Sequence, residues 1–583
     1  MRRHIHQCFY RAIFISVLGA FLCAGAGALG GLSPAFAGEE MPRVFVLGID
    51  GMDPKLLSEF IGKGRMPNFE AFVKDNTFMP LGTSIPPQSP VAWASFITGT
   101  DPGSHGIYDF IHRNTEDYFP QFSTSSVTPP EKTLTIGSWV LPLSGGKALN
   151  LMRGKTFWQS LDDHDIPYTI FRIPSNFPPA PCEGISISGM GTPDLLGTYG
   201  TFSFFTDDPS YTGMEVSGGD ISLISFENGR VTAALTGPDN TMRVGSPALK
   251  RPFTVDVDRE NRSAKIVIGG EVIILDEGEW SEWVRVSFEL LGPLKSVPGI
   301  CLMYLKSVTP YLQLYVSPVN IDPSDPALPI STPSAFSKDL YKRIGLYYTQ
   351  GMPEDTKALE SGVIDDGEFL RQTDIVLKER MKMLDAMLDD YKEGLLFFYI
   401  STLDQATHMM WRNMDPSHPN HPADHAHQYA IENLYAKMDS ILGVVERRIP
   451  ENTTLIIMSD HGFAPFYKKF NLNTWLYQNG FLDIVDPRQL GMLPAHSNTS
   501  WRRTRAYGLG INSLYVNLRG REAHGIVEPD EYDALLDELE DKLLAVRDPE
   551  TGGPGGEDAV PNEKCIPRRC ARGRTRCDRR LLQ

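Results

Sequence analysis

Three short apolar segments of the chain are each followed by an aspartate. The segments are residues 44–47, 395–400 and 455–458, and the aspartates after them are Asp50, Asp404 and Asp460. Continuous apolar runs of this length, bounded by turn residues, are typical of strands buried on both faces, as in parallel sheets. The ligands of such a sheet are expected at the carboxyl ends of its strands.

Helical patterns lie between these segments. Leu377, Met381, Leu384 and Leu388 recur at the spacing of one helix face, and residues 429–445 are similarly amphipathic. The alternation of strands and helices predicts an α/β fold with a mainly parallel central sheet flanked by helices.

The middle of the chain has a different pattern. From residue 209 to residue 319, apolar and polar positions alternate, as at 264–268 and 284–288, with glycine-containing turns between them. This alternation predicts β-strands, and we interpret the region as a β-rich insertion or cap. The predicted division is a first core segment at 38–208, the insertion or cap at 209–330 and a second core segment at 331–552.

The N-terminal segment has the pattern of an export signal. Arginines precede an apolar stretch at 12–32, and residues 35–37 (Ala-Phe-Ala) have the small-x-small pattern that a signal peptidase cuts. We interpret residues 1–37 as a signal peptide and expect the mature chain to begin near Gly38. A membrane anchor is the alternative, because the stretch is almost long enough to span a bilayer. Its many Gly and Ala residues and the cleavage pattern favour removal, which predicts a periplasmic or extracellular protein without a membrane span.

The composition is that of a globular protein with an acidic balance. The 583 residues are 22% charged and 41% hydrophobic, with a formal net charge of -17. This charge argues against a protein that binds nucleic acid by bulk electrostatics, so we expect a small or locally bound ligand. The sequence does not determine an oligomeric state.

The C-terminal region contains a predicted helix and a tail without a pattern. Residues 530–546 are amphipathic and are expected to form a helix capped by Asp530. The atypical tail, residues 553–583, is rich in Arg and Cys. Two interpretations stay open, a genuine basic tail and an out-of-frame translation of a GC-rich gene, and we favour the frameshift.

Side chains suited to metal or phosphate chemistry follow the three apolar segments. Asp50 ends a strand beside glycines that permit close backbone approach, which suits such a site, although a helix-capping aspartate is the alternative interpretation. Asp404 and His408 are four residues apart, so in a helical turn both can reach one ion. Asp460 and His461 are adjacent and precede a glycine, and from a bend they can ligate one metal.

Ser89 is a further candidate. It precedes Pro90, and this pair is typical of a helix N-cap followed by the first helical residue. Ser89 is therefore expected at the mouth of a helix that begins at Pro90, where anions are favoured. The alternative is that Ser89 only caps the helix. As a nucleophile it needs activation, which a metal bound to its oxygen provides.

Taken in order along the chain, these elements resemble the alkaline phosphatase superfamily. The nearest branch is the type I phosphodiesterase/nucleotide pyrophosphatase family. Supporting motifs are Met66-Pro67-Asn68 and residues 98–107, which look like that family's stretch after the nucleophile. The resemblance covers residues 43–205 and 331–550.

The resemblance implies a phosphoester hydrolase with two divalent ions, zinc in the family, and a small phosphoester or nucleotide-like substrate. Ser89 would attack phosphorus and form a covalent phosphoryl- or nucleotidyl-serine, which water activated at the second ion would release. Carried over by position, the ligands of one ion are Asp50, Ser89, Asp460 and His461, and those of the other are Asp404, His408 and a histidine near the C-terminus.

That last histidine is not found in the expected context. His496 and His524 are the only histidines after His461. Two alternatives therefore stand beside a phosphodiesterase: a phosphomonoesterase or phosphotransferase on the same scaffold, and a catalytically impaired, truncated protein that binds a phosphorylated ligand. No arginine can be assigned to clamp a dianionic monoester, which favours diesters.

Other histidines have no place in this scheme. Four crowd a proline-rich loop after His408: His418, His421, His425 and His427. They either line a substrate site or belong to a solvated loop, and we favour the solvated loop. His105 and His112 are expected to support the region around the nucleophile.

Overall fold

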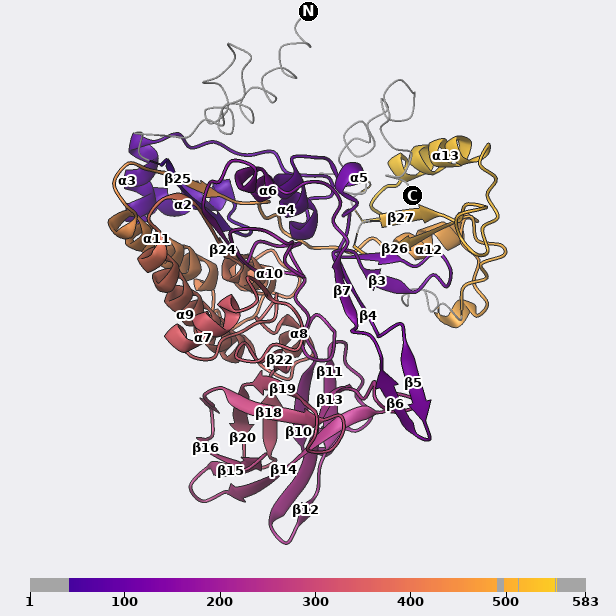
Figure 1. Ribbon diagram of the computed structural model, residues 1–583. Coiled ribbons are helices and arrows are strands. Elements are labelled where there is room, and N and C mark those ends of the chain that lie inside the picture. The colour runs from indigo at the N-terminus through magenta and orange to yellow at the C-terminus, as the bar shows by residue number, and fades with distance from the viewer. Residues whose placement is uncertain (1–40, 490–497, 512, 551, 553–583) are drawn as a thin grey trace, which may run out of the picture. The chain divides into compact units, whose positions relative to one another are not determined.

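The structure, a computed structural model, describes residues 41–489, 498–511, 513–550 and 552 (Figure 1). The chain divides into two compact units, Met1–Pro42 and Arg43–Gln583, and every helix and strand given below belongs to the second. The predicted signal peptide, His496 and the tail at 553–583 lie outside the described residues. No helix in the described part is long and apolar enough to cross a membrane.

Within the described residues, a six-stranded sheet forms the centre of the fold. Its strand order is β23 (Ser331–Thr332), β9 (Ile185–Ile187), β8 (Tyr168–Phe171), β24 (Gly394–Ile400), β1 (Arg43–Ile49) and β25 (Thr453–Met458). Neighbouring strands are parallel except β23 and β9. In register, Val46 of β1 pairs with Phe397 of β24 and with Ile456 of β25. The predicted mainly parallel sheet is confirmed, and the three apolar runs are three adjacent strands of it.

Side chains of this sheet alternate between two cores, because successive residues of a strand point to opposite faces. Phe45, Leu47 and Phe398 belong to the larger core, and Val46 and Phe397 to the core on the other face. The larger core is covered by α2 (Pro54–Gly62), α3 (Pro67–Asp75), α7 (Phe336–Ile344), α8 (Thr356–Glu360), α9 (Asp366–Asp390), α10 (Thr402–Met414) and α11 (Ala430–Arg448), and the other by α4 (Ser89–Thr98) and α6 (Phe157–Asp162). The two predicted helical patterns are confirmed as α9 and α11.

Three further sheets form the β-rich middle of the chain, magenta in Figure 1. The strand order of the first sheet is β11 (Gly219–Leu223), β10 (Phe202–Thr206), β21 (Gln313–Val316), β20 (Met303–Ser307) and β17 (Glu279–Trp280). The second sheet has the order β12 (Phe226–Glu227), β13 (Arg230–Asp239), β14 (Ala248–Asp258), β15 (Ser263–Ile268) and β16 (Glu271–Asp276). The third sheet has the order β18 (Val284–Glu289), β19 (Ser296–Cys301) and β22 (Asn320–Ile321). They enclose a core of their own, which includes Phe253, Ile266 and Leu314. That this region acts as a cap stays a prediction.

Short hairpins lie inside the predicted first core segment, where the sequence pattern did not indicate them. Their strands are β2 (Ile111–Arg113), β3 (Pro120–Phe122), β4 (Ser125–Thr128), β5 (Thr133–Ile136), β6 (Trp139–Pro142) and β7 (Lys147–Asn150). The C-terminal part contains α12 (Leu472–Gln478), β26 (Ala506–Leu509), β27 (Ser513–Val516) and α13 (Tyr532–Leu544). Tyr118, between β2 and β3, stacks on Trp501 with ring centroids 3.9 Å apart, so this hairpin packs against the C-terminal part.

The predicted cap of the last helix is wrong. Helix α13 begins at Tyr532, its N-cap position is Glu531, and no side chain caps it. Asp530 instead lies in a turn before the helix, where the backbone N–H of Glu531 donates to the carbonyl of Glu528 at 3.0 Å. The helix buries Leu535 and Leu539.

Glu522 is expected to be a major contributor to stability. It forms a salt bridge with Arg113 at 3.0 Å, in which the two side chains are 0% and 4% exposed. Removing one partner of such a pair leaves a buried charge, so Glu522→Gln should lower the free energy of unfolding by about 3 kcal/mol. The matched change in the exposed Lys147–Glu131 pair, Glu131→Gln, should alter it by less than about 0.5 kcal/mol. Chemical unfolding at neutral pH measures both, and equal effects would contradict the expectation.

Candidate active site

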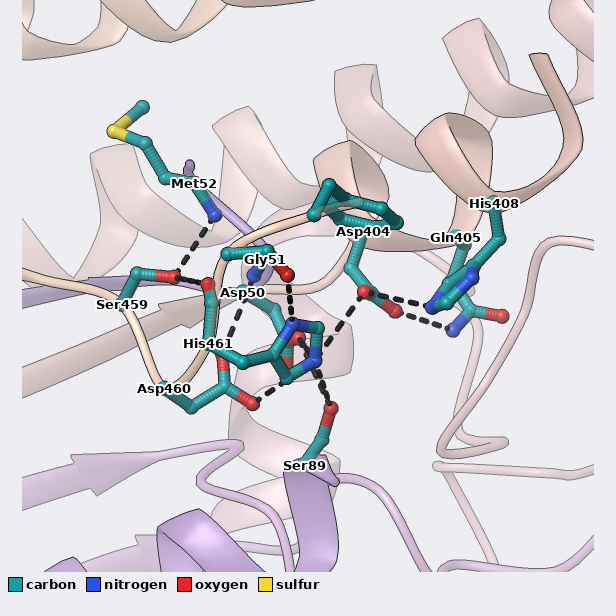
Figure 2. A network of polar contacts seen from close by, with 12 residues as sticks. Asp50, Gly51, Met52, Ser89, Asp404, Gln405, His408, Ser459, Asp460 and His461 are labelled. Atoms are coloured by element: carbon teal, nitrogen blue, oxygen red, sulfur yellow. Dashed lines mark hydrogen bonds and ion pairs between the residues drawn. The ribbon is translucent and has the colours of Figure 1, made fainter. Parts of the chain in front are cut away.

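The carboxyl ends of three adjacent strands each lead to an aspartate. Asp50 follows β1 directly, Asp404 lies in the first turn of α10 after β24, and Asp460 follows β25. These residues are 0%, 3% and 7% exposed, respectively. Figure 2 shows them in one group with Ser89, His408 and His461. The parallel register therefore brings the three aspartates, with His408 and His461, to the same edge of the sheet, and Ser89 joins them from the start of α4.

Asp50 is not a helix cap. The N-cap of α2 is Asp53, which accepts from backbone N–H groups of the first turn at 2.8 and 2.9 Å. Asp50 Oδ1 accepts from Ser89 Oγ at 3.1 Å. Asp50 Oδ2 accepts from Trp93 Nε1 at 3.2 Å and from the hydroxyl of Tyr399. The site interpretation of Asp50 is thus the one that its contacts support.

The predicted helix start near Ser89 is wrong by one residue. Helix α4 begins at Ser89 itself, and Gln88 occupies the N-cap position. The reason is that the Gln88 carbonyl already accepts from the N–H groups of Val91 and Ala92, both at 2.9 Å. The Ser89 hydroxyl makes no capping bond and is directed into the site instead. The alternative that Ser89 only caps the helix therefore does not hold.

His461 directs its Nε2 atom at the same group. Its Nδ1 lies 2.9 Å from the carbonyl of Gly462, and because a carbonyl only accepts, Nδ1 carries a proton, which leaves Nε2 as the ring atom that a metal can bind. Nε2 lies 3.1 Å from Ser89 Oγ, 3.5 Å from Asp50 Oδ1 and 3.5 Å from Asp460 Oδ2. Metal-binding histidines commonly have this arrangement, with the other N–H donated to a backbone carbonyl.

His408 lies beside Asp404 on α10, as their spacing predicts. Its Nε2 is 3.2 Å from Asp404 Oδ1, and its side chain is 57% exposed. Burial opposes protonation of this ring, but the charge of Asp404 outweighs it and raises the pKa of His408 above its ordinary value. His408 therefore lies at the solvent side of the group, whereas Asp404 is buried.

The buried carboxylates repel one another. Burial, together with the charges of Asp460 and Asp404, raises the pKa of Asp50 well above its ordinary value. In the part of the chain that the structure describes, these three carboxylates lie beside histidine ring nitrogens and form no ion pair with a Lys or Arg. A buried charge without such a partner is costly unless it binds a metal.

The residues present fit a divalent cation. Asp404 Oδ1 and Asp460 Oδ2 are buried and accept no hydrogen bond from the described residues. Ligand atoms of Asp50, Asp460 and His461 lie within 4.8 Å of one another. Carboxylate oxygens and an imidazole nitrogen are ligands that zinc and related metals take.

Gly51 allows the backbone to pass close to the carboxylates. Its φ is +66°, and a Cβ there would lie 2.9 Å from Asp404 Oδ1 and 2.5 Å from the Phe463 ring. Its N–H donates to Asp460 Oδ1 at 3.2 Å. A side chain does not fit at this position, so the close backbone approach expected here is observed.

Among the described residues, no histidine from the C-terminal part lies beside Asp404 and His408. The backbone N–H of His524 donates to the Tyr118 hydroxyl at 2.9 Å, and its ring stacks on that of Tyr118. Within the described ranges, His408 and His461 are the only histidines within 4.0 Å of an Asp404 oxygen.

Three supporting residues were not predicted. Tyr399 and Trp93 hold Asp50 Oδ2, but in the sequence they have the appearance of core residues and carry no signal. Ser459 Oγ accepts from the Met52 N–H at 2.8 Å and donates to the His461 carbonyl at 2.9 Å. Its place directly before Asp460-His461 was a signal that could have identified it.

His105 supports the helix that carries Ser89. It ends α5 (Pro102–His105), is buried, and accepts from the Ile107 N–H at Nδ1, at 3.1 Å. Nε2 therefore carries the proton and donates to Ser95 Oγ of α4 at 3.0 Å. Burial lowers the pKa of His105 to about 4.

Because of His105, the free energy of unfolding is expected to decrease as the pH is lowered. An unfolded histidine takes up a proton below pH 6.5, whereas the folded protein takes it up only near pH 4. The contribution is present above about pH 6.5 and is lost towards pH 4, by about 3 kcal/mol in total. His105→Gln, which keeps a donor and an acceptor, should lack this part of the pH dependence. Chemical unfolding of both proteins between pH 4 and 7 measures it; parallel pH profiles would contradict the assignment.

The fold and the site together define a class of protein. A mainly parallel sheet with a group of Asp and His side chains at the carboxyl ends of its strands, beside a serine at a helix start, is an alkaline phosphatase-like arrangement. A family model described as Type I phosphodiesterase / nucleotide pyrophosphatase matches residues 44–182 and 319–578. Because the match covers more than half of the chain, the chain belongs to this family, a branch of the alkaline phosphatase superfamily. Comparisons with curated proteins and with solved structures gave no match.

Family membership supports a phosphoester hydrolase of the phosphodiesterase/nucleotide pyrophosphatase type. Members are metal-dependent in general and act on small phosphoester substrates. The matched ranges leave out residues 183–318, which contain most of the β-rich middle of the chain.

Proposed function

We propose that this protein is an exported, zinc-dependent phosphodiesterase or nucleotide pyrophosphatase in which Ser89 is the nucleophile. The observation that carries the proposal is the position of Ser89 Oγ, 3.1 Å from Asp50 Oδ1 and 3.1 Å from His461 Nε2. The serine also opens α4, and the N-terminus of a helix favours a phosphate group. A hydroxyl among candidate metal ligands at such a position is suited to attack phosphorus.

We assign the six site residues to two divalent ions. One divalent ion would be held by Asp50, Ser89, Asp460 and His461, and the other by Asp404 and His408. When bound, such ions lower the pKa of a serine hydroxyl and neutralise negative charge on a phosphate.

In the proposed reaction, Ser89 is the nucleophile and Asp50 orients it. Ser89 Oγ releases its proton to solvent and attacks phosphorus; the Oγ–P bond forms while the P–O bond to the leaving group breaks, and the leaving oxygen takes a proton from solvent. In the second step the oxygen of a water molecule bonds to the phosphorus of the phosphoryl- or nucleotidyl-serine, the Oγ–P bond breaks, and Ser89 Oγ takes up the proton that the water releases. Asp50 orients the nucleophile through the bond to Oγ, while Trp93 and Tyr399 hold its other oxygen.

A phosphodiester is the proposed substrate class. A phosphomonoester carries a second negative charge, which a Lys or Arg side chain in the site could bind. Among the described residues, no Lys or Arg forms an ion pair with the carboxylates of the site. Membership of the phosphodiesterase family supports the same choice.

Hydrolysis of an aryl phosphodiester beside the matching monoester tests the proposal. The chain beginning at Gly38, with added zinc, is expected to cleave the diester faster. Faster cleavage of the monoester would support the phosphomonoesterase alternative, and no cleavage of either would support a protein that only binds phosphorylated ligands. The mass of the exported chain tests the signal peptide, because removal near Gly38 is expected.

A further inference from the structure

Two histidines outside the active site direct ring nitrogens at each other. They lie in the loop that follows α10, among four histidines in its sequence. His421 Nε2 lies 3.1 Å from His425 Nδ1, and the ring centroids are 5.0 Å apart. The separation of two nitrogens on one tetrahedral zinc ion, at bonds of 2.0–2.1 Å, is about 3.3–3.4 Å. The two nitrogens therefore need to move apart by only about 0.3 Å to bind one ion.

The hydrogen bond of His421 determines which nitrogen is free. Its Nδ1 lies 2.8 Å from the carbonyl of Arg412, which only accepts, so Nδ1 carries the proton and Nε2 has its lone pair towards His425. This is the arrangement of His461 in the candidate active site, where Nδ1 faces a backbone carbonyl. Such a bond fixes the tautomer and the ring orientation that a metal needs.

His425 can become the second ligand without a net loss of protons. When both rings are neutral and His421 Nδ1 carries its proton, the Nδ1–H of His425 donates to His421 Nε2. Because the residue is exposed, its single proton can move to the Nε2 position in contact with water, which frees Nδ1. A metal ion then replaces a hydrogen bond between two neutral rings.

The loop holds His421 in place. The backbone N–H of His421 donates to the carbonyl of His418 at 2.9 Å, and the N–H of Asn420 donates to His418 Nδ1 at 3.1 Å. Pro419 and Pro422 restrict the backbone on both sides of His421. Ordering of the ligands before binding reduces the entropy that binding must overcome.

We propose that His421 and His425 form a separate site for a divalent transition metal, with water completing its coordination. Imidazole nitrogens suit zinc, copper and nickel. Arg412 lies in the last turn of α10, so a bound cation would tie the loop to the carboxyl end of that helix, where positive charge is favoured. The same helix carries Asp404 and His408. The proposal does not depend on the catalytic function, because neither histidine belongs to the active site.

Zinc content at a fixed free zinc concentration tests this site. The full chain, freed of metal with a chelator and then dialysed against zinc, is compared with His421→Gln and His425→Gln. Each variant is expected to bind one zinc ion fewer than the unaltered chain. The matched control is His164→Gln, because His164 is also exposed and its Nδ1 also faces a carbonyl, that of Ser160 at 2.8 Å.

Each result decides the proposal. Loss of the ion in both variants, with the control unchanged, supports a paired site. Unchanged zinc content in either variant overturns it, and so does an equal loss in His164→Gln, which would indicate binding to any exposed histidine. His425 is exposed, so its variant is expected to fold normally, which circular dichroism verifies.

Discussion

Replacing Ser89 with alanine is expected to lower kcat for an aryl phosphodiester by about 1,000-fold or more while the protein stays folded. The change removes the oxygen that bonds to phosphorus in the proposed reaction and that lies 3.1 Å from Asp50 Oδ1. Loss of one buried hydroxyl should lower the free energy of unfolding by only about 1 kcal/mol. Initial rates and chemical unfolding measure the two effects separately.

Ser84→Ala is the matched control for this variant. Ser84 lies in the same segment before α4, and its hydroxyl donates to the Pro86 carbonyl at 2.8 Å rather than to the site. It should retain the activity of the unaltered chain. Mass spectrometry of rapidly quenched reactions should find on Ser89, in the control and in the unaltered chain, a phosphoryl group that still carries the second ester substituent of the substrate. Normal turnover by Ser89→Ala would sink the assignment of the nucleophile.

Asp460→Asn is expected to change the free energy of unfolding in opposite directions without and with zinc. Burial, opposed by His461 and reinforced by Asp404, raises the pKa of Asp460, so its charge destabilises the metal-free protein at neutral pH. Removing that charge should therefore raise the free energy of unfolding in a chelator. With zinc at about 100 times its Kd, the unaltered chain should gain about 3 kcal/mol. The variant, with one ligand fewer, should gain less than about 1 kcal/mol under the same conditions.

Thermal unfolding in chelator and in zinc, together with the zinc content of each protein, measures this reversal. Asp439→Asn is the control, because Asp439 is also buried but accepts from Asn68 Nδ2 and from the Phe69 N–H, at 2.7 and 2.8 Å, away from the site. It should destabilise the protein equally in both buffers. If Asp460→Asn destabilises equally in both as well, Asp460 does not bind zinc.

The accuracy of the sequence analysis differed between local and distant features. The apolar runs predicted three strands of the central sheet, and the helix periodicity predicted α9 and α11. Helix starts were less accurate: Ser89 is helical rather than a cap, and α13 begins after Asp530. Both errors concern which carbonyl or side chain reaches the first free N–H groups, and several neighbouring residues can do so.

Support of the site depends on contacts that no local pattern shows. Tyr399 lies in an apolar strand and Trp93 in an apolar helix, yet both bond to Asp50 Oδ2. The hairpin that contains Tyr118 packs on Trp501, far along the chain, although its own residues predict neither the hairpin nor its partner. Aromatic residues of this kind are common in ordinary cores, so their sequence carries no mark of the role.

By itself, the sequence determined the class of fold, the family, and the residue types at the strand ends. Each of these depends on residues close together in the chain: the period of apolar positions, the spacing of Asp404 and His408, and the adjacency of Asp460 and His461. Only the tertiary structure decided that Ser89 Oγ reaches His461 Nε2, 372 residues away, and that the three aspartates share one buried group. The physical reason is that β24, β1 and β25 pair side by side and in parallel, and such pairing is decided by long-range packing rather than by local preference.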